Sequence, residues 1–225
     1  MCWDIEKTQN GGNITRIIDL THEMAEGMPV YPGTEPPIFR NVATLERDGF
    51  SEKKLAFTSH TGTHMDAPAH ILPDGATLDA LPVDQFMGSA VVVDLRRVGP
   101  VVELKDLKPY EERLRQSEYL VCHTGWASFW GQQGYTQGFP VLSPQACVWV
   151  ASLGLKGVAL DAISVDPVES LDLPNHKTIL NAKMVIVENL TNLERLPRSV
   201  ILWCLPLKIA DADGAPVRAV ALVEP

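Results

Sequence analysis

The chain has 225 residues, of which 45% are hydrophobic and 21% charged, as in a folded protein with one substantial core. Its formal net charge is -9, so it lacks the clustered Lys and Arg that give nucleic-acid binding its affinity. No apolar run approaches the roughly 20 residues that span a bilayer, and the first residues lack the features of a secretory signal. We therefore expect a cytoplasmic protein that binds a small molecule and has no nucleic-acid or membrane partner.

The chain is expected to form one domain, because no flexible linker or block of charge divides it. This domain is predicted at 14–225, after a loose leader at 1–13. The four cysteines are far apart and form no Cys-x-x-Cys pair, so we expect buried hydrophobic side chains and not disulfides, zinc ligands or nucleophiles. These cysteines are Cys2, Cys122, Cys147 and Cys204.

Short strands dominate the first part of the chain. A strand is predicted at 15–20, and alternating apolar residues predict two more at 37–46 and 52–59. Between the first two lies a proline-rich segment, 28–37, which is too long for a hairpin and too constrained for a flexible linker. A rigid loop that carries an aromatic side chain, here Tyr31, is well suited to form the wall of a pocket.

The rest of the chain mixes strands and helices. Short apolar runs predict buried strands at 90–95, 119–125, 158–160, 184–187, 200–205 and 217–223, with Asp213-Gly214 as the turn before the last. Helices are predicted at 106–116, 143–154 and 174–182, and a short helix or a turn at 78–86. The clearest has Ser143 as N-cap, Pro144 at the first helical position and Gly154 just past its end. Because strands outnumber helices and alternate with them irregularly, we expect an α/β fold with a mixed sheet and flanking helices.

Half of the six histidines lie in the single stretch 59–70. In an extended backbone alternate side chains share a face, so His60, His64 and Asp66 should point the same way. A straight strand would place the Cα atoms of His60 and His64 roughly 13 Å apart, which is almost too far for two imidazoles to reach one ion. We therefore expect a bent strand, with Gly62 providing the positive φ or bulge.

These side chains predict a metal site. Imidazoles and carboxylates together suit a borderline cation such as zinc or manganese. His60, His64 and Asp66 could hold one ion and leave a coordination position for water. An ordinary polar surface turn would explain a single pair of histidines, but with His70 four such groups fall within eleven residues, which favours a metal.

Other polar residues are weaker candidates. His22 and His123 lie at predicted strand ends, where a structural role is expected. Asp161 follows a buried strand and is a candidate for orienting a metal ligand. Ser59 and Thr63 have histidine neighbours, but a nucleophilic hydroxyl needs a base and an orienting acid, and the metal would occupy those groups.

The stretch His60-Thr-Gly-Thr-His64-Met-Asp66-Ala-Pro-Ala-His70 resembles the His-x-Gly-Thr-His-x-Asp-x-Pro-x-His signature of the cyclase family of metal-dependent hydrolases. That family includes bacterial kynurenine formamidases and isatin hydrolases. The resemblance continues through 174–193 and 205–220. It implies a swivelling β/β/α fold, an arylformamidase-like activity in tryptophan catabolism, and a homodimer or homotetramer.

The resemblance also assigns roles to residues. It implies that His176 and Glu188 supply a second metal, with Asp66 and Glu188 bridging the two ions, whereas on the residues alone a structural role is favoured for each. His70 matches the family's catalytic histidine, which can pass a proton to the leaving group near pH 7. Tyr31 stands where formamidases typically carry a tryptophan that contacts the substrate. Two zinc or manganese ions per chain are thus expected.

The resulting hypothesis is a hydrolase of a small aromatic amide, lactam or lactone, in which a divalent ion activates water and polarises the carbonyl. N-formylkynurenine is the leading single candidate substrate. Two alternatives stay open: a cyclase or dehydratase in which the metal stabilises an enolate, and a non-catalytic metal-dependent small-molecule binding protein. His70 argues against the last, because binding alone needs no proton-transfer group.

Overall fold

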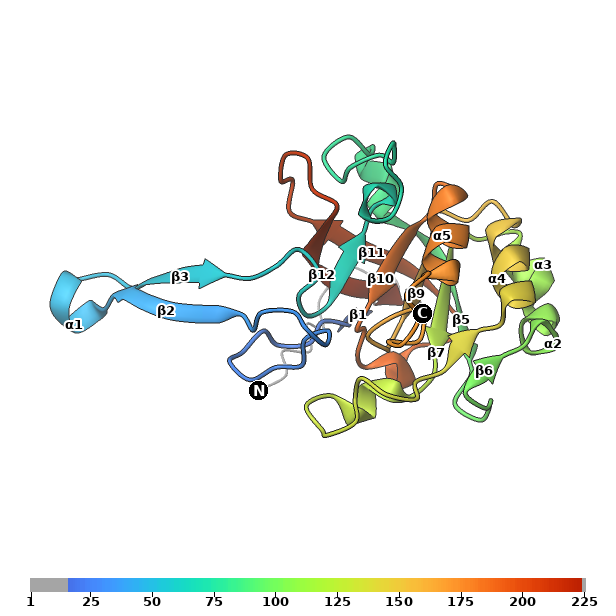
Figure 1. Ribbon diagram of the computed structural model, residues 1–225, viewed down its shortest axis with the longest axis horizontal. Helices are drawn as coiled ribbons and strands as arrows, with labels where there is room; N and C mark the ends of the chain where they lie inside the picture. The colour runs from blue at the N-terminus through green and yellow to red at the C-terminus, as the bar shows by residue number, and fades with distance from the viewer. Residues whose placement is uncertain (1–15, 224–225) are drawn as a thin grey trace, which may run out of the picture.

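Residues 16–223 are described by the computed structural model, so the expected leader at 1–13 and Cys2 lie outside the described residues (Figure 1). An eight-stranded sheet forms the body of the molecule. In spatial order its strands are β1 (Arg16–Asp19), β12 (Gly214–Val223), β11 (Ser199–Pro206), β5 (Met87–Asp94), β7 (Tyr119–His123), β9 (Gly157–Leu160), β10 (Val185–Glu188) and β4 (His64–Asp66).

The sheet is mixed and closes partly into a barrel. β5, β7, β9 and β10 run parallel, while β11, β12, β1 and β4 pair with their neighbours antiparallel. β12 also pairs with β4, which joins the last strand of the row to the second. The prediction of an α/β fold with a mixed sheet and flanking helices is therefore confirmed.

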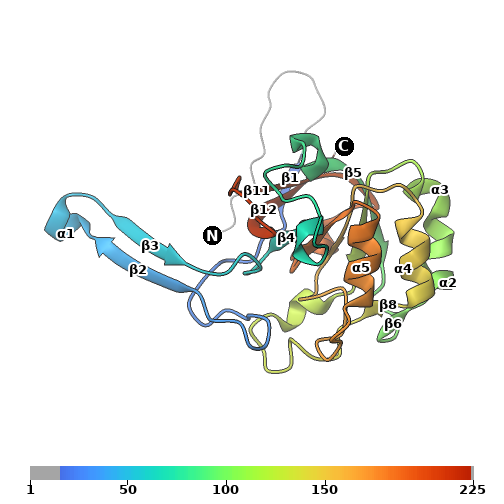
Figure 2. The same ribbon diagram turned by 45° about the horizontal axis from the view of Figure 1, so that its top comes forward.

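Two hydrophobic cores follow from the alternation of side chains along the strands. On the outer face of the parallel strands, Val91, Leu120, Val158 and Ile186 belong to one buried cluster with the apolar residues of α4 (Pro144–Ala151) and α5 (Pro174–Asn181). These two helices lie side by side on that face (Figure 2). The opposite face fills the barrel, where the cluster includes Val92, Val121, Ala159, Val187 and Met65.

The helix predicted at 143–154 is confirmed. The Ser143 hydroxyl accepts a hydrogen bond from the backbone N–H of Ala146, and Gly154, past the end of α4, has a φ of +77°. The segment predicted as one helix at 106–116 is instead two short helices, α2 (Leu104–Leu107) and α3 (Glu111–Leu114). A 3-10 turn containing Pro109 separates them, because proline has no N–H to continue the α-helical ladder.

The strands predicted at 37–46 and 52–59 form a separate hairpin. β2 (Ile38–Ala43) and β3 (Glu52–Ala56) pair only with each other among the strands of residues 16–223, and the short helix α1 (Leu45–Asp48) connects them. Both predicted strands are therefore too long. The hairpin extends away from the body in both views (Figures 1 and 2).

Smaller elements complete the part of the chain that is described. β6 (Val101–Val102) and β8 (Val141–Leu142) form a short parallel pair. Further 3-10 turns lie at Pro68–His70, Val83–Phe86, Trp126–Phe129 and Leu193–Arg195. The predicted Asp213-Gly214 turn is displaced, since Gly214 already belongs to β12. No helix within residues 16–223 has the length and apolar character needed to cross a bilayer.

Candidate metal centre

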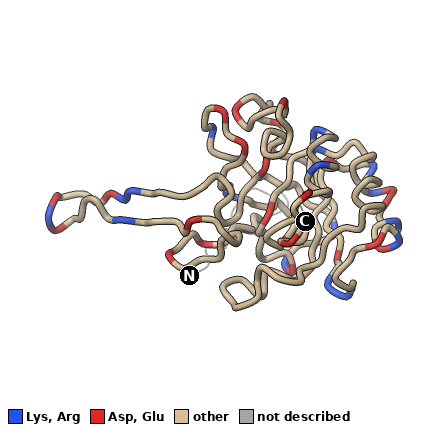
Figure 3. The backbone as a smooth tube through the Cα atoms, in the orientation of Figure 1, with Lys and Arg blue, Asp and Glu red and all other residues tan. Residues whose placement is uncertain are grey.

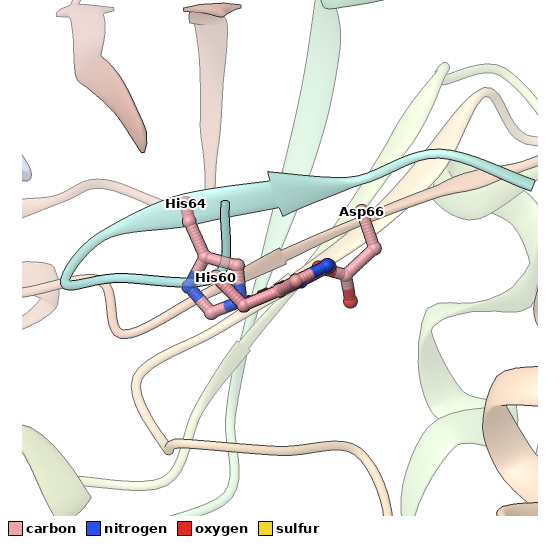
Figure 4. Close-up of side chains that lie close together, drawn as sticks. All are labelled: His60, His64 and Asp66. Carbon is pink, nitrogen blue, oxygen red and sulfur yellow. Dashed lines mark hydrogen bonds and ion pairs between the residues drawn. The ribbon is translucent and has the colours of Figure 1, made fainter. Parts of the chain in front are cut away.

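The bend expected between His60 and His64 is present. Only His64 to Asp66 form a strand, β4, and His60 lies in the turn before it, so the predicted bent strand is shorter than expected. Gly62 has a φ of +68°, a conformation that glycine adopts without steric cost. The turn brings the imidazole centroids of His60 and His64 to 5.2 Å from each other (Figure 4).

A second glycine makes room for the same ring. A Cβ atom placed on Gly214 would lie 2.6 Å from Cε1 of His60, closer than real contacts allow. Gly214 of β12 is paired with Asp66 of β4. Because Gly214 has no side chain, its backbone can lie directly against the imidazole of His60. The position of His60 therefore depends on a residue more than 150 positions away along the chain.

One group of ligand-type atoms surrounds Oδ1 of Asp66. It lies 2.7 Å from Nδ1 of His60 and 3.3 Å from Nε2 of His64. Nε2 of His64 is also 3.4 Å from Oε2 of Glu188, at the end of β10. β4 and β10 are paired antiparallel, with His64 opposite Glu188, which explains why these groups meet.

A second group surrounds the other oxygen of each carboxylate. Nε2 of His176, in the first turn of α5, lies 3.6 Å from Oδ2 of Asp66 and 3.6 Å from Oε1 of Glu188. Ligand atoms about 2.1 Å from a tetrahedral zinc are about 3.4 Å apart. The distances of 3.3 to 3.6 Å in the two groups fit this spacing, whereas the 2.7 Å hydrogen bond between His60 and Asp66 would lengthen around an ion. The five residues predicted as metal ligands, which are His60, His64, Asp66, His176 and Glu188, thus converge in space.

The electrostatics also fit a cation. Asp66 is 1% exposed, and its Oδ2 has no hydrogen-bond partner among the described residues, which is costly for a buried carboxylate without a counter-charge. Burial and the neighbouring Asp66 raise the pKa of Glu188 to about 7. Burial lowers the pKa of His176, but its hydrogen bond to Asp166 and the nearby carboxylates of Asp66 and Glu188 outweigh this and raise it to about 10. The cavity therefore draws positive charge, which a divalent ion can supply in place of protons.

Each of the three histidines is held by its outer ring nitrogen, which leaves the inner nitrogen facing the carboxylates. Such a partner is usual for a metal-binding imidazole, because it fixes the tautomer and the ring orientation. The partners are Oδ2 of Asp213 for Nε2 of His60 at 2.9 Å, the carbonyl of Gly62 for Nδ1 of His64 at 2.8 Å, and Oδ2 of Asp166 for Nδ1 of His176 at 2.8 Å.

Asp166 and Asp213 are the site residues that sequence reasoning missed. Asp166 is fully buried, and besides the imidazole it accepts the backbone N–H groups of Asn175 and His176 at the start of α5. Asp213 lies in the loop before β12, where the sequence indicated only a turn. Neither belongs to a recognisable ligand spacing, so only the folded chain shows their part.

His70, the predicted proton-transfer residue, lies beside the two groups. It ends the 3-10 turn Pro68–His70, and its ring centroid is 3.9 Å from that of His60 and 5.8 Å from that of His176. Its Nδ1 is 3.4 Å from Oδ2 of Asp213. Burial lowers the pKa of His70, opposed by Asp66, so the imidazole is neutral near pH 7. It lines the cavity next to the ligand groups.

The site opens into a cavity of about 260 Å³, whose other walls come from the proline-rich loop and from the start of α5. Tyr31 lines it as predicted, and its hydroxyl donates a hydrogen bond to the carbonyl of Val168 at 3.3 Å. The apolar side chains of Val30, Ile163 and Leu173 also face the cavity. An apolar wall opposite a polar floor suits a small aromatic ligand with one polar reacting group.

The weaker candidates have structural surroundings. His22 stacks on Trp130 with ring centroids 4.0 Å apart. Asp161 accepts the N–H groups of Thr124 and Gly125 and so stabilises a turn, rather than orienting one of the five residues. The Thr63 hydroxyl donates to a backbone carbonyl. Within the described chain the cysteines are free and buried, as predicted: Cys122, Cys147 and Cys204.

Comparison with known proteins places this geometry in context. The chain is 33% identical over 207 residues to a kynurenine formamidase of Erythrobacter litoralis, covering 91% of this chain and 93% of that protein. A solved isatin hydrolase bound to the product analogue thioisatinate has the same fold, with a TM-score of 0.85 at 22% identity, covering 94% of this chain and 93% of that one. A solved potential metal-dependent hydrolase with cyclase activity gives a TM-score of 0.76 at 25% identity, and the match covers 94% of this chain and 100% of that one.

A family model described as "Putative cyclase" matches residues 18–167. This range contains the histidine turn, β4 and His70, and the formamidase relative extends the match over most of the remaining chain. The resemblance carried by the spacing of His60, His64, Asp66 and His70 is thereby confirmed. The chain belongs to the cyclase family.

Proposed function

We propose that this protein is a metal-dependent hydrolase that cleaves the C–N bond of a small aromatic amide, with N-formylkynurenine as the first candidate substrate. The observation that carries the proposal is the convergence of three imidazoles and the Glu188 carboxylate on the two carboxylate oxygens of Asp66, of which Oδ2 has no hydrogen-bond partner among the described residues, at the floor of a partly apolar cavity. The relatedness to a kynurenine formamidase supports the choice of an amide over other substrates.

The two groups of atoms would hold two divalent ions, zinc or manganese, and Asp66 and Glu188 would contribute to both groups. His60 and His64 would complete one site, and His176 the other. Bound there, a divalent ion lowers the pKa of a water molecule and polarises a carbonyl group. The spacing of the ligand atoms and the chemistry of the donors support this arrangement.

The remaining steps belong to side chains of the chain itself. His70, neutral near pH 7, would take a proton from the attacking water and return it to the leaving amine, with Asp213 next to its Nδ1 to stabilise the charged ring. Tyr31 would contact the aromatic ring of the substrate, since its hydroxyl is held by Val168 and its ring borders the cavity. Apolar neighbours of Tyr31 would exclude bulk water.

Several finer attributes belong to the same proposal and are supported by family membership. They are a swivelling β/β/α type of fold, a single domain spanning 14–225, a homodimer or homotetramer, and a cytoplasmic location.

The decisive test is an assay of the purified protein, loaded first with zinc and then with manganese, on N-formylkynurenine, isatin, an aryl formamide and an aryl lactone. We expect the formyl amide to be cleaved fastest. If isatin or the lactone is cleaved fastest, the protein is still a hydrolase, but its substrate is a lactam or a lactone and not a formyl amide. Absence of turnover by fully metallated protein would overturn the proposal in favour of a cyclase, or of a binding protein if a ligand binds without product.

The metal content provides a separate test. We expect about two ions per chain by elemental analysis, and Glu188→Ala should lose at least one, because both groups use this carboxylate. Glu112→Ala, which removes an exposed glutamate from α3, is the matched control and should keep both. A content near one that Glu188→Ala and His176→Ala leave unchanged would reduce the site to His60, His64 and Asp66.

A further inference from the structure

The backbone carbonyl of Gly62 is the group in the histidine turn that orients His64. It accepts the Nδ1 proton of the imidazole at 2.8 Å and so leaves Nε2 facing the carboxylates. A carbonyl oxygen has two acceptor positions, and one bond alone leaves its peptide plane free to rotate. Gly62 has no side chain, so the residue itself adds no restraint to this plane. The direction of the imidazole therefore depends on a second partner of the same carbonyl.

Asn189 is that second partner. Its Nδ2 donates to the Gly62 carbonyl at 2.8 Å, and its own backbone carbonyl accepts the Thr63 hydroxyl at 2.6 Å. One residue thus holds the turn on both sides of the peptide group that joins Gly62 to Thr63. Asn189 directly follows Glu188 at the end of β10, and its N–H donates to the carbonyl of Ala162. It therefore links the histidine turn to the strand that carries another predicted ligand.

The backbone at Asn189 does not itself require an asparagine. Its φ is +59°, a left-handed conformation that glycine adopts without cost and that asparagine tolerates better than most residues. The residue is only 3% exposed, so both polar atoms of its side chain need partners inside the protein. Glycine would satisfy the backbone here without burying an amide. What the asparagine side chain adds is its contact with the histidine turn.

Tyr135 determines which way the amide of Asn189 faces. Its hydroxyl donates to Oδ1 of Asn189 at 2.6 Å, so the NH2 group of the amide is directed to the Gly62 carbonyl. Tyr135 is 2% exposed, and burial raises the pKa of its hydroxyl, which therefore keeps the proton that it donates. Nε1 of Trp126 donates to the backbone carbonyl of Tyr135 at 2.7 Å and helps to fix the tyrosine.

Further contacts lead from Tyr135 back to the histidine turn. Trp130 packs against Tyr135 with ring centroids 5.2 Å apart, and His22 stacks on Trp130. The backbone N–H of His22 donates to the Thr63 hydroxyl at 3.0 Å. Residues 126–139 contain no Lys, Arg, Asp or Glu, so this segment is tan throughout in Figure 3. Neutral hydrogen bonds and ring contacts, and not ion pairs, therefore connect this segment to the turn.

We infer that Asn189 is a positioning residue of the metal centre: its amide, oriented by Tyr135, fixes the Gly62 carbonyl and through it the imidazole of His64. The inference rests on the metal centre under the proposed function, and it concerns a residue that is neither a predicted ligand nor the proton-transfer group. Among the described residues, His64 and Asn189 supply the hydrogen bonds to this carbonyl. Losing such an outer partner typically lowers metal affinity by about 10- to 100-fold.

The first experiment compares two glycine variants by competition with a chromogenic chelator on the zinc-loaded protein. Asn189→Gly keeps the left-handed backbone and removes the amide, so the ion held by His64 should bind about tenfold or more weakly. Asn192→Gly is the matched control, because Asn192 has a φ of +58° and donates its Nδ2 to the carbonyl of Asp19, outside the metal centre. Equal zinc affinities of the two variants would overturn the inference.

The part played by Tyr135 is tested by removing its hydroxyl. Tyr135→Phe should weaken zinc binding by about two- to tenfold, the usual value of one hydrogen bond. Tyr119→Phe, which removes another buried hydroxyl bonded to a carbonyl, should not. Because Tyr135 acts through Asn189, adding Tyr135→Phe to Asn189→Gly should cause no further loss. Additive losses in the double variant would contradict this order of action.

The Nδ1 proton of His64 gives a measurement that does not depend on turnover. With 15N-labelled histidine in the zinc-loaded protein, NMR should show that this proton exchanges with water about tenfold faster or more in Asn189→Gly than in Asn192→Gly. A purely structural role of Asn189 would predict similar exchange in both variants when their stabilities in urea are similar, and would overturn the inference.

The inference and the proposed hydrolase can fail separately. Unchanged zinc affinity and proton exchange in Asn189→Gly would overturn the inference and leave the hydrolase intact. An unmodified protein that binds no divalent ion would overturn both. Zinc binding that weakens in Asn189→Gly, in a protein that cleaves none of the tested amides, would support the inference and contradict the proposed activity.

Discussion

Asp166 shows at the scale of a single residue how the site is held in place. One carboxylate accepts the N–H groups of Asn175 and His176 and the Nδ1 proton of the same histidine. In Asp166→Asn the side-chain NH2 group cannot accept a hydrogen bond, so a buried N–H loses its partner and the imidazole loses its orientation. We expect the affinity for the second ion to fall by about 10- to 100-fold.

Competition with a chromogenic chelator would measure this affinity. Asp94→Asn, which changes an exposed aspartate paired with Arg96, is the control and should bind both ions normally. Equal affinities of the two variants would mean that Asp166 stabilises α5 and has no effect on the metal.

His70 allows the proton-transfer step to be separated from metal binding. Its ring lies next to the two ligand groups, and it shares Asp213 with His60. We therefore expect His70→Ala to keep its metal and its fold while turnover falls by about 10² or more. Metal analysis and steady-state kinetics on the same sample decide this. A loss of metal with normal turnover in metal-saturated buffer would make His70 a ligand.

The residues of the site divide into those that local spacing predicts and those that it does not. His60, His64, Asp66 and His70 fall in one short motif, so their convergence needs only the bend at Gly62. Asp213 lies 153 positions from His60, and no spacing rule connects the two. Long-range partners of this kind are set by the register of β12 on β4, which sequence patterns do not specify.

At the scale of elements, β12 controls the first ligand group through a residue that has no side chain. Adding a methyl group in Gly214→Ala would place Cβ 2.6 Å from the ring of His60, so the ring must move away from Asp66. We expect this variant to fold but to lose one ion. Gly99→Ala, where a Cβ meets nothing within 4 Å, is the matched control. Elemental analysis with circular dichroism measures both properties, and full metal content in Gly214→Ala would contradict the expectation.

Element types were predictable where local chemistry determines them. Ser143, Pro144 and Gly154 carry the capping signals of α4, and the apolar runs at β5, β7 and β10 reflect burial on both faces. The predicted helix at 106–116 failed because Pro109 was not weighed as a helix breaker. The closure of β12 onto β4 could not be predicted, because it depends on contacts between distant segments, and no local pattern shows that the hairpin of β2 and β3 projects from the body.

For the whole molecule, His22 predicts a dependence of stability on pH. Burial lowers its pKa from 6.5 to about 4. The unfolded chain therefore takes up this proton first, so stability is full above pH 6.5 and falls as the pH drops towards 4. In His22→Phe, which can keep the stacking on Trp130, this contribution disappears. Urea unfolding at pH 7 and pH 5 should show a smaller loss for the variant, and equal losses would contradict the expectation.

The three-residue strand β4 has a consequence for the kinetics of the molecule. Among the strands of residues 16–223, it alone joins β10 to β12 and so closes the sheet. Ions held by Asp66 of β4 and Glu188 of β10 would link these two strands, and separation of β4 from β10 would be the route by which metal leaves. Amide hydrogen exchange in β4 should then slow markedly on loading with zinc, while exchange in β5 stays the same. The residence time of the metal would thus measure how often the barrel opens.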